Sequence, residues 1–389
     1  MKITFEKDVI CAAVIPLLSG VSTKNTIPAV ECILIEANAD GSCVLTTYDT
    51  EKGVRVTISA EVIEDGASVI NASKFSQTVR AMDGSHITLT VDQRNCATIV
   101  SGKSSHTMSA LNAKDFPEIP RLLSQQGFHI SGKTLRDMMS KCLFAMGVND
   151  QRVVLNGLYF HINENHMKMV SCDSFKMAIC GTTTDIDSLD QADKEFKFIV
   201  PNKCIGELYK LLGSTIKEEN DDVCIYINKK NIIFVLGNVI FFSKLIEGEY
   251  INYDRIVLKN HRITVFADRE NLLSSLERAA LITEEKVAGS SGRSHVKLET
   301  TETVLKISAN SGAGSAYDEI SIVREGDDLA IAFNNRFLMD CLRACTSERI
   351  KLSLSSALTS MNIEPADPET EETMGDSELF MLLPVRMKD

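Results

Sequence analysis

Hydrophobic and polar residues alternate strictly in three separate stretches of the chain. The hydrophobic positions are Ile87, Leu89 and Val91, then Val223, Ile225 and Ile227, and finally Ile350, Leu352 and Leu354. A period of two predicts strands with one face on a core and the other toward solvent. Three further predicted strands end in a residue whose side chain can bond its own backbone in a turn, namely Asp49, Asp173 and Asn310.

A helical pattern precedes each alternating stretch, at residues 71–82, 200–212 and 333–344. Each pattern begins with a small polar residue and then Lys or Arg, followed by hydrophobic residues at helical spacing. Lys74, Lys203 and Arg336 are separated by about 130 residues, a regular interval that indicates an internal repeat. Because the chain has 389 residues, this interval is close to a third of it, and we predict three copies of one unit.

A second helix is predicted near the start of each unit. At residues 264–282, for example, Asp268 is a suitable N-cap, and Leu272 and Leu276 fall on one face. Each unit then has the order β-α-β-β-α-β-β, with both helices packed on one face of an antiparallel sheet, which is an α+β fold. A segment with two prolines at 115–127 and a segment near 259 give predicted domains 1–125, 126–259 and 260–389.

The composition is typical of a globular protein without a membrane segment. Hydrophobic residues make up 44% of the chain and charged residues 24%. The longest apolar run, at 231–242, contains Gly237 and is too short to cross a bilayer. The N-terminus has no apolar stretch of the secretory type, and the eleven scattered cysteines are typical of free thiols in a reducing compartment. We therefore expect a cytoplasmic protein with no membrane partner.

The motifs of catalysis and of metal binding are absent from the sequence. The phrase SGKSS at 101–105 is not a phosphate-binding loop, since Ala97 stands where that motif needs Gly, and it predicts a hairpin turn. Cys341 and Cys345 lie one helical turn apart, but no CxxC pair or suitably spaced His accompanies them. We predict no catalytic residue, no metal and no cofactor. An enzyme with a dispersed site remains an alternative, because paired carboxylates can meet in a fold without leaving a motif.

The repeated basic residues point instead to an anionic ligand. A net charge of −12 argues at first against nucleic acid, but net charge does not describe how charges are distributed. In each unit a second cation follows the first on the same helix, namely Arg80, Lys210 and Arg343. For any one of them the simplest interpretation is a solvated helix face, and the threefold recurrence favours function. Helix starts also favour anions, and we expect Asn71, Asn202, Asn334 and Asn335 to add donors there.

Several short stretches together resemble a known family. They are TIPAV after a lysine-containing loop at residue 26, DFPEIP at 115–120, VVLNGLYF at 153–160, SKLIEGEY at 243–250 and LPVRM at 383–387. With the triple repeat, they make the chain similar to the bacterial sliding clamp, the beta subunit of DNA polymerase III, over its whole length. No single stretch is decisive, but order, period and length agree.

The resemblance implies a fold and a function. In the family, two chains join head to tail in a ring of six domains, with helices lining the hole and sheets forming the rim. It implies a homodimer that encircles double-stranded DNA without sequence specificity and tethers the replicative DNA polymerase, the clamp loader and other clamp-motif proteins, with no catalysis of its own. The alternative is a repeat scaffold that binds proteins only, or an enzyme with a dispersed site.

The resemblance also implies three sets of site residues. The DNA-facing positions fall on Lys24, Lys74, Arg80, Asn149, Lys203, Lys210, Asn334 and Arg336. The pocket for partner peptides falls on Leu155, Cys172, Ser174, Met177, Ile251, Arg255, Ile256, Leu358, Ser360, Met381, Leu382, Pro384, Val385, Arg386 and Met387. The dimer interface falls on Lys74 and His106 opposite Leu281 and Ile282.

Some of these positions depart from the family pattern. Cys172, Ser174 and Ile251 stand where Thr, Gly and Pro are usual, so the preferred peptide is expected to differ. Val153 and Val154 replace a pair that is often aromatic, which argues against base stacking there. An acidic run at 365–378 reads as a solvated loop without an assigned function.

Overall fold

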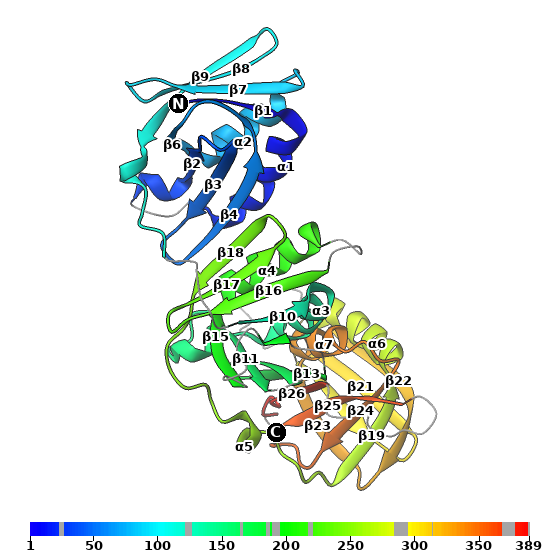
Figure 1. Cartoon of the computed structure of the whole chain (residues 1–389). Coiled ribbons are helices and arrows are strands. Elements are labelled where there is room, and N and C mark those ends of the chain that lie inside the picture. The colour runs from blue at the N-terminus through cyan, green and yellow to red at the C-terminus, as the bar shows by residue number, and fades with distance from the viewer. Residues whose placement is uncertain are drawn as a thin grey trace. The chain divides into compact units, whose positions relative to one another are not determined.

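The computed structural model describes residues 1–22, 27–120, 127–163, 166–183, 187–188, 195–216, 221–283, 295–312, 314–367 and 378–387. These residues form two compact units. Unit 1 comprises Met1–Arg136, Asp185–Lys194 and Gly206–Leu245, and unit 2 comprises Asp137–Thr184, Glu195–Ile205 and Ile246–Asp389. Each unit is built around one large antiparallel sheet with helices packed on it (Figure 1).

The sheet of unit 1 has the strand order β14-β10-β16-β17-β18-β4-β3-β2-β6-β9-β8-β7-β1-β5. Its strands from the first third of the chain are β1 (Lys2–Glu6), β2 (Cys32–Ala37), β3 (Ser42–Tyr48), β4 (Lys52–Ser59), β5 (Glu61–Glu64), β6 (Gly66–Asn71), β7 (His86–Val91), β8 (Cys96–Ser101) and β9 (Ser104–Asn112). The others are β10 (Gly127–Ser131), β14 (Asp187–Ser188), β16 (Asp222–Ile227), β17 (Asn231–Leu236) and β18 (Val239–Lys244).

The sheet of unit 2 has the strand order β15-β11-β12-β13-β26-β25-β24-β19-β22-β21-β20-β23. Four strands come from the middle of the chain, namely β11 (Gly157–Asn163), β12 (His166–Cys172), β13 (Lys176–Thr183) and β15 (Glu195–Pro201). The others are β19 (Ile263–Asp268), β20 (His295–Thr300), β21 (Val304–Ser311), β22 (Gly314–Glu325), β23 (Leu329–Asn334), β24 (Arg349–Leu354), β25 (Met361–Ala366) and β26 (Glu378–Leu382).

Paired helices cover the sheets as the sequence predicts. The helices are α1 (Lys7–Leu17), α2 (Ala72–Ala81), α3 (Gly132–Cys142), α4 (Asn202–Thr215), the short α5 (Tyr253–Ile256), α6 (Arg269–Thr283) and α7 (Asn335–Ala344). In unit 1, α1 packs against α2 and β4, and in unit 2, α6 packs against α7, β21 and β22 (Figure 1). The predicted cap of α6 is confirmed, because the Asp268 carboxylate accepts a bond from the Asn271 N–H at 2.7 Å, and Leu272 and Leu276 are fully buried.

The strand count predicted for each unit is wrong. Between the two long helices of the first third lie β2 to β6, and between those of the last third lie β20 to β23, where the sequence pattern predicted two strands. After the second helix there are three strands instead of two. The reason is burial on both faces: β2 is buried at every position except Glu36, so its sequence does not alternate.

Two of the three predicted turn residues act as expected. The Asp49 carboxylate accepts bonds from the N–H groups of Glu51 and Lys52, and Asp173 does the same for Phe175 and Lys176. Asn310 does not, because it lies inside β21, which continues to Ser311. The hairpin turn predicted at 101–105 is confirmed between β8 and β9, where Gly102 has φ of 59°.

The two sheets run across the predicted domain boundaries. In unit 1, β4 pairs with β18, so that Val56 faces Val239. In unit 2, β13 pairs with β26, so that Cys180 faces Glu378. The middle third of the chain therefore contributes strands to both units, and the three-domain division stays a prediction.

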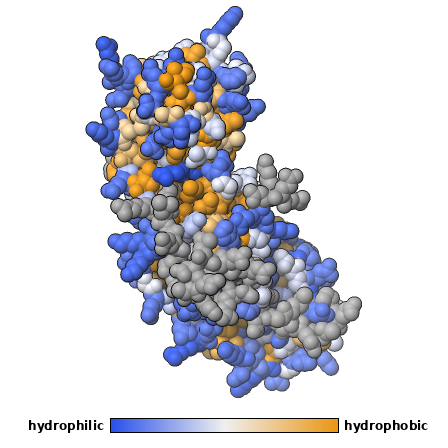
Figure 2. Space-filling model, viewed as in Figure 1, coloured by the Kyte–Doolittle hydropathy of each residue, from blue (hydrophilic) through white to orange (hydrophobic). Residues whose placement is uncertain are grey.

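The core consists of aliphatic and phenylalanine side chains. Phe5 and Phe75 are fully buried in unit 1, and Phe333 and Phe380 in unit 2. As predicted, the eleven cysteines form no disulfide, and all but Cys11 and Cys96 are buried. No helix in the described ranges has the length and apolar character needed to span a membrane. On the face shown in Figure 2, hydrophilic residues are mixed with smaller hydrophobic patches.

Most of the acidic run at 365–378 lies outside the described residues. Its two ends belong to strands, because Pro365 and Ala366 are in β25 and Glu378 begins β26. Glu378 is nearly buried and forms an ion pair with Lys141, the penultimate residue of α3. The interpretation of these end residues as solvated loop is therefore wrong.

Candidate nucleic-acid and partner-binding sites

Two of the three repeated helices begin in the same way. The Asn71 side chain caps α2 by accepting a bond from the Lys74 N–H at 3.0 Å. The Asn334 side chain caps α7 by accepting a bond from the Phe337 N–H at 3.2 Å. An amide oxygen bonded to the first turn is the usual way to satisfy the free N–H groups of a helix start. These caps fix the backbone of the first turn, from which the cationic side chain projects.

The start of the third repeated helix, α4, is hydrogen-bonded to a loop outside the helix. The Asn202 amide nitrogen donates to the Gly147 carbonyl at 2.7 Å, and the Asn202 backbone N–H donates to the Asn156 carbonyl at 2.9 Å. The start of α4 is thus attached to the loop at 147–156. The expectation that Asn335 donates to a ligand is wrong, since its side chain is buried and donates to the Leu276 carbonyl at 3.0 Å. For Asn202 it stays a prediction.

The first cation of each repeated helix is exposed, although Arg336 interacts electrostatically with Asp340 of its own helix. Lys74, Lys203 and Arg336, here called the first cations, are exposed and form no ion pair with any described residue. The hydrophobic residues of the same helices face the core, such as Phe75 and Val79 in α2. The first cations are therefore available to an anion in solution.

The second cation of each helix forms an ion pair or a hydrogen bond within the protein. Lys210 lies 3.0 Å from the Glu207 carboxylate, and Arg343 lies 2.9 Å from the Glu277 carboxylate. Arg80 donates to the Ser76 carbonyl of its own helix at 3.1 Å. Arg80, Lys210 and Arg343, here called the second cations, therefore differ from the first cations, although all six are exposed.

The other two predicted DNA positions are Asn149 and Lys24. Asn149 is exposed in the loop at 147–156, with φ of 57°, a left-handed conformation that asparagine tolerates better than most residues. Lys24 lies outside the described residues.

A compact apolar cluster contains the central residues of the predicted peptide pocket. We call it the apolar cluster, and its buried members are Leu155, Val170, Cys172, Met177, Ile179, Tyr253 and Met381. Ile251 packs against it from the loop before α5. Five predicted pocket residues are thus brought together from positions far apart in the sequence. Met177 and Met381 contribute flexible side chains to its buried interior.

The remaining predicted pocket residues differ in exposure. Leu358 is 71% exposed in the turn after β24, and Met387 is 40% exposed at the C-terminal end of the described chain. Ser360 and Leu382 are buried. Of the other predicted pocket residues, Arg255, Ile256 and Arg386 are exposed, and Pro384 and Val385 are partly buried.

The sequence analysis missed several members of the cluster. Val170 and Ile179 lie two residues from Cys172 and Met177, so strand alternation could have indicated them. Tyr159 and Tyr250, which pack on the cluster, stack with ring centroids 4.7 Å apart. No local signal pairs them, because β11 and the segment before α5 are far apart in the chain.

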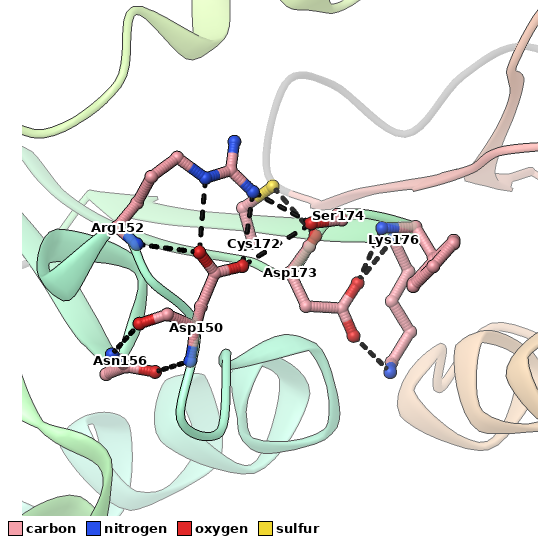
Figure 3. A network of polar contacts seen from close by, with 8 residues as sticks. Asp150, Arg152, Asn156, Cys172, Asp173, Ser174 and Lys176 are labelled. Atoms are coloured by element: carbon pink, nitrogen blue, oxygen red, sulfur yellow. Dashed lines mark hydrogen bonds and ion pairs between the residues drawn. The ribbon is translucent and has the colours of Figure 1, made fainter.

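A polar network that the sequence did not predict lies beside the apolar cluster (Figure 3). Arg152 bonds the Asp150 carboxylate through Nε and Nη2, both at 3.2 Å, and Nη2 donates to the Ser174 hydroxyl at 2.8 Å. The hydrogen bond from Arg152 lowers the pKa of Asp150 below its usual value. The same bond raises the pKa of Arg152. Both groups are therefore charged at neutral pH.

Burial controls the neighbouring thiol. It raises the pKa of Cys172 to about 11, although Arg152 acts in the opposite direction. Cys172 is thus a neutral, apolar side chain of the cluster at neutral pH and a poor nucleophile. Among the described residues no group of three or more His, Cys, Asp or Glu side chains is arranged to hold a metal.

Two strands, β9 and β22, have an open edge within the described chain. In β9, residues 104–109 pair with β8 on one side and with no described strand on the other. In β22, residues 314–321 pair only with β21 within the described chain. His106 is exposed on β9, and Leu281 is 76% exposed near the end of α6. Lys74 is exposed on α2, and Ile282 is partly exposed.

Three family models match the chain in order. They are the N-terminal domain of the DNA polymerase III beta subunit at residues 1–120, the central domain at 129–252 and the C-terminal domain at 254–374. Together they cover nearly the whole chain.

Known proteins with this organisation are similar over their full length. A curated relative, the beta sliding clamp of Staphylococcus aureus strain Mu50, is 25% identical, with 99% of each chain covered. The crystal structure of a putative DNA polymerase III beta subunit from Eubacterium rectale is 27% identical with a TM-score of 0.89, and it covers all of both chains. A DNA polymerase sliding clamp from Pseudomonas aeruginosa is 25% identical with a TM-score of 0.88, again over all of both chains.

Proposed function

The chain belongs to the family of DNA polymerase III beta subunits, which are DNA sliding clamps and not enzymes, and on this premise we propose that two copies close into a ring around duplex DNA. The ring tethers the replicative DNA polymerase to its template. The observation that carries the proposal is the threefold helix start, each with an exposed cation.

The first cations support contact with the DNA backbone. Duplex DNA presents phosphates at regular intervals, and contacts to them carry no sequence information. A protein that meets this ligand at several places needs the same cation at each place. Lys74, Lys203 and Arg336, with Asn149 and Asn334 beside two of the helix starts, supply such contacts in our proposal.

The second cations support sliding. Lys210 and Arg343 each share their charge with a glutamate, so they add little to phosphate attraction. A closed ring is held by its topology and does not need tight binding. Weak contacts that break easily let it move along the duplex. The acidic net charge of −12 is compatible with this arrangement, because only the surface that faces DNA needs to be basic.

The open strand edges support assembly of two copies. Unpaired N–H and C=O groups along β9 and β22 are ready to pair with a strand of another chain. The turn before β9 carries Lys103, whereas β22 carries Glu319 and also Asp318, which is paired with Arg278 of its own chain. We propose that β9 of one copy meets β22 of the other, with Leu281 and Ile282 beside the joint. Lys74 then belongs either to this joint or to the DNA surface.

The apolar cluster supports a pocket for partner peptides. Leu358 and Met387 are exposed apolar side chains, and Ile251 packs at the edge of the buried cluster, so flexible apolar residues are available to a partner. We propose that the polymerase, the clamp loader and other clamp-motif proteins insert a short peptide there. Replication of this kind takes place in the bacterial cytoplasm, and we place the protein there.

Polymerase processivity tests the proposal. The replicative polymerase is allowed a single binding event on a primed circular template, with clamp loader and ATP, and the length of the product is measured with and without this protein. A clamp lengthens the product many-fold, and only when the loader is present. A scaffold that binds proteins alone leaves the length unchanged, which would reject the clamp proposal.

A further inference from the structure

Arg152 is held in one orientation beside the apolar cluster. Its guanidinium bonds both carboxylate oxygens of Asp150 through Nε and Nη2, and Nη2 also donates to the Ser174 hydroxyl. Asp150 is fixed in turn by Asn156, whose side chain accepts from the Asp150 N–H and donates to the Asp150 carbonyl, both at 2.8 Å. A planar guanidinium fixed by three bonds presents its remaining donors in a defined direction.

Arg152 is close to members of the apolar cluster both along the chain and through its hydrogen-bond partner Ser174. Along the chain it comes three residues before Leu155, a buried member of the cluster. Its partner Ser174 lies between Cys172 and Met177, two further members. Figure 3 shows the guanidinium beside the Cys172 thiol, with both oxygens of Asp150 on one side of it.

One end of the guanidinium has no partner in the described chain. The contacts of Arg152 use Nε and Nη2, and Nη1 makes no bond with any described residue (Figure 3). The side chain of Arg152 is 55% exposed, so a ligand in solution can reach Nη1. The two N–H groups there can donate to an acceptor on a bound peptide.

The other charges near the cluster favour an anionic acceptor. Asp173 is occupied by Lys176, at 2.7 Å. Arg255 and Arg386 are exposed and form no ion pair with a described residue, and Asp254 is the exposed carboxylate on the same helix as Arg255. Asp150 and Asp173 are thus both already paired with a cation. The N–H groups of Arg152 that have no described partner are complementary to a peptide that carries a carboxylate.

We propose that Arg152 is a specificity-determining residue of the pocket and selects partner peptides that carry an Asp or Glu next to the hydrophobic residues that fill the apolar cluster. Asp150 and Ser174 are positioning residues, which hold the guanidinium so that Nη1 faces the peptide. This inference rests on the proposed function, since it assumes that the cluster receives peptides. It also explains a role for Ser174, which stands where the family resemblance implies a glycine without a side chain to hold Arg152.

A pair of peptides tests the inference. Two fluorescein-labelled clamp-motif peptides differ only in one residue, which is Asp in one and Asn in the other, and such pairs are made at each non-hydrophobic position of the motif. Fluorescence anisotropy at low salt gives the affinity of the wild-type chain and of Arg152→Gln, Ser174→Ala and Arg262→Gln. Circular dichroism verifies that each variant is folded.

The wild type is expected to prefer the Asp peptide about ten-fold at one position, as for a hydrogen bond between charged groups. Arg152→Gln removes this preference and leaves the affinity for the Asn peptide unchanged. Ser174→Ala reduces the preference by loosening the guanidinium, and Arg262→Gln, the matched control at an exposed arginine outside the pocket, leaves it within about two-fold of wild type. A change in the Asn affinity as large as that in the Asp affinity would indicate a structural role only and would overturn the inference.

Two further outcomes separate this inference from the proposed function. Tight binding of both peptides with equal affinity at every position overturns the role of Arg152 and leaves the pocket in place. Absence of binding by either peptide overturns the pocket itself, and the inference with it. An equal loss of preference in Arg262→Gln would show that net charge and not the held guanidinium selects the peptide, and would also overturn the inference.

Discussion

The helix starts and the apolar cluster are built in opposite ways. The helix starts with their first cations occur three times, and in α2 and α7 each depends on a bond between residues three positions apart. The apolar cluster occurs once and combines residues as far apart in sequence as Leu155 and Met381. A repeated surface suits a ligand that is itself repetitive, such as the phosphates of a duplex. A single adaptable pocket suits a series of different peptides that compete for one place.

The two regions meet in the loop at 147–156. Asn202, beside the first cation of α4, donates to the Gly147 carbonyl and bonds Asn156. Asn156 in turn holds Asp150, the partner of Arg152. The candidate DNA contact Asn149 is the neighbour of Asp150 in this loop. One short loop thus positions residues of both candidate surfaces, although the two surfaces are built in different ways.

The largest effect is expected from charges placed in the pocket. Exchange of Pro384 and Met387 for Glu should weaken binding of a clamp-motif peptide by more than about 100-fold, because a carboxylate is costly to bury against apolar side chains. Fluorescence anisotropy measures the affinity, and sedimentation measures the dimer, which should be unchanged. Ile63→Glu, at an exposed apolar position of β5, is the control. Unaltered peptide affinity in the double variant would remove the pocket assignment.

The next effect concerns the first cations. Replacement of Lys74, Lys203 and Arg336 by Ala should weaken DNA binding and reduce the slope of log affinity against log salt by roughly 0.9 for each phosphate that the protein no longer neutralises. Anisotropy of a labelled duplex at several salt concentrations gives the slope.

The second cations serve as the matched set for this measurement. Replacement of Arg80, Lys210 and Arg343 should have a smaller effect, because two of the three are already paired with glutamates. Equal effects of the two triple variants would show that the distinction between first and second cations has no functional meaning.

A gain in DNA affinity is expected when the pairing glutamates are neutralised. Glu207→Gln and Glu277→Gln together release Lys210 and Arg343, so the salt slope should rise above that of the wild type. The same duplex assay measures it, and single-molecule tracking of loaded protein should show slower sliding. Glu270→Gln, which removes a carboxylate paired with Arg269 at the start of α6, is the control. A slope equal to that of wild type would mean that these two cations do not reach DNA.

The smallest effect is expected from the loop at 147–156. Asn156→Ala removes the two bonds to Asp150 and should lower the free energy of unfolding by about 1–3 kcal/mol, measured by urea denaturation. Because the loop serves both surfaces, peptide affinity and DNA affinity should both fall slightly. A fall in only one of them would show that the loop does not connect the two regions.

Local patterns in the sequence predicted the helices well. The cap at Asp268, the buried face at Leu272 and Leu276 and the turns at Asp49 and Asp173 all depend on residues a few positions apart. The strand count failed where burial on both faces removes alternation, as in β2. Patterns over a few residues contain no information on which strands pair across the repeats, so the joints β4–β18 and β13–β26 were not predictable.

The candidate site shows the same division. The first cations follow from the repeat, since each stands at a fixed place in a helix start. Five pocket residues of the cluster came from the family resemblance and not from any local pattern. Arg152 and Asp150 were missed, because their importance depends on the Ser174 hydroxyl, which the turn after β12 brings to them. A contact of this kind between a loop and a distant turn has no signal in the sequence.

The central claim is that the protein holds DNA by encircling it, and retention on circular DNA tests this most directly. The protein is loaded on a nicked circular plasmid, free protein is removed, and the bound fraction is followed before and after a restriction enzyme opens the circle. The account predicts long retention on the circle and rapid release from the linear form as the ring slides off the ends. Equal release from both forms would contradict it.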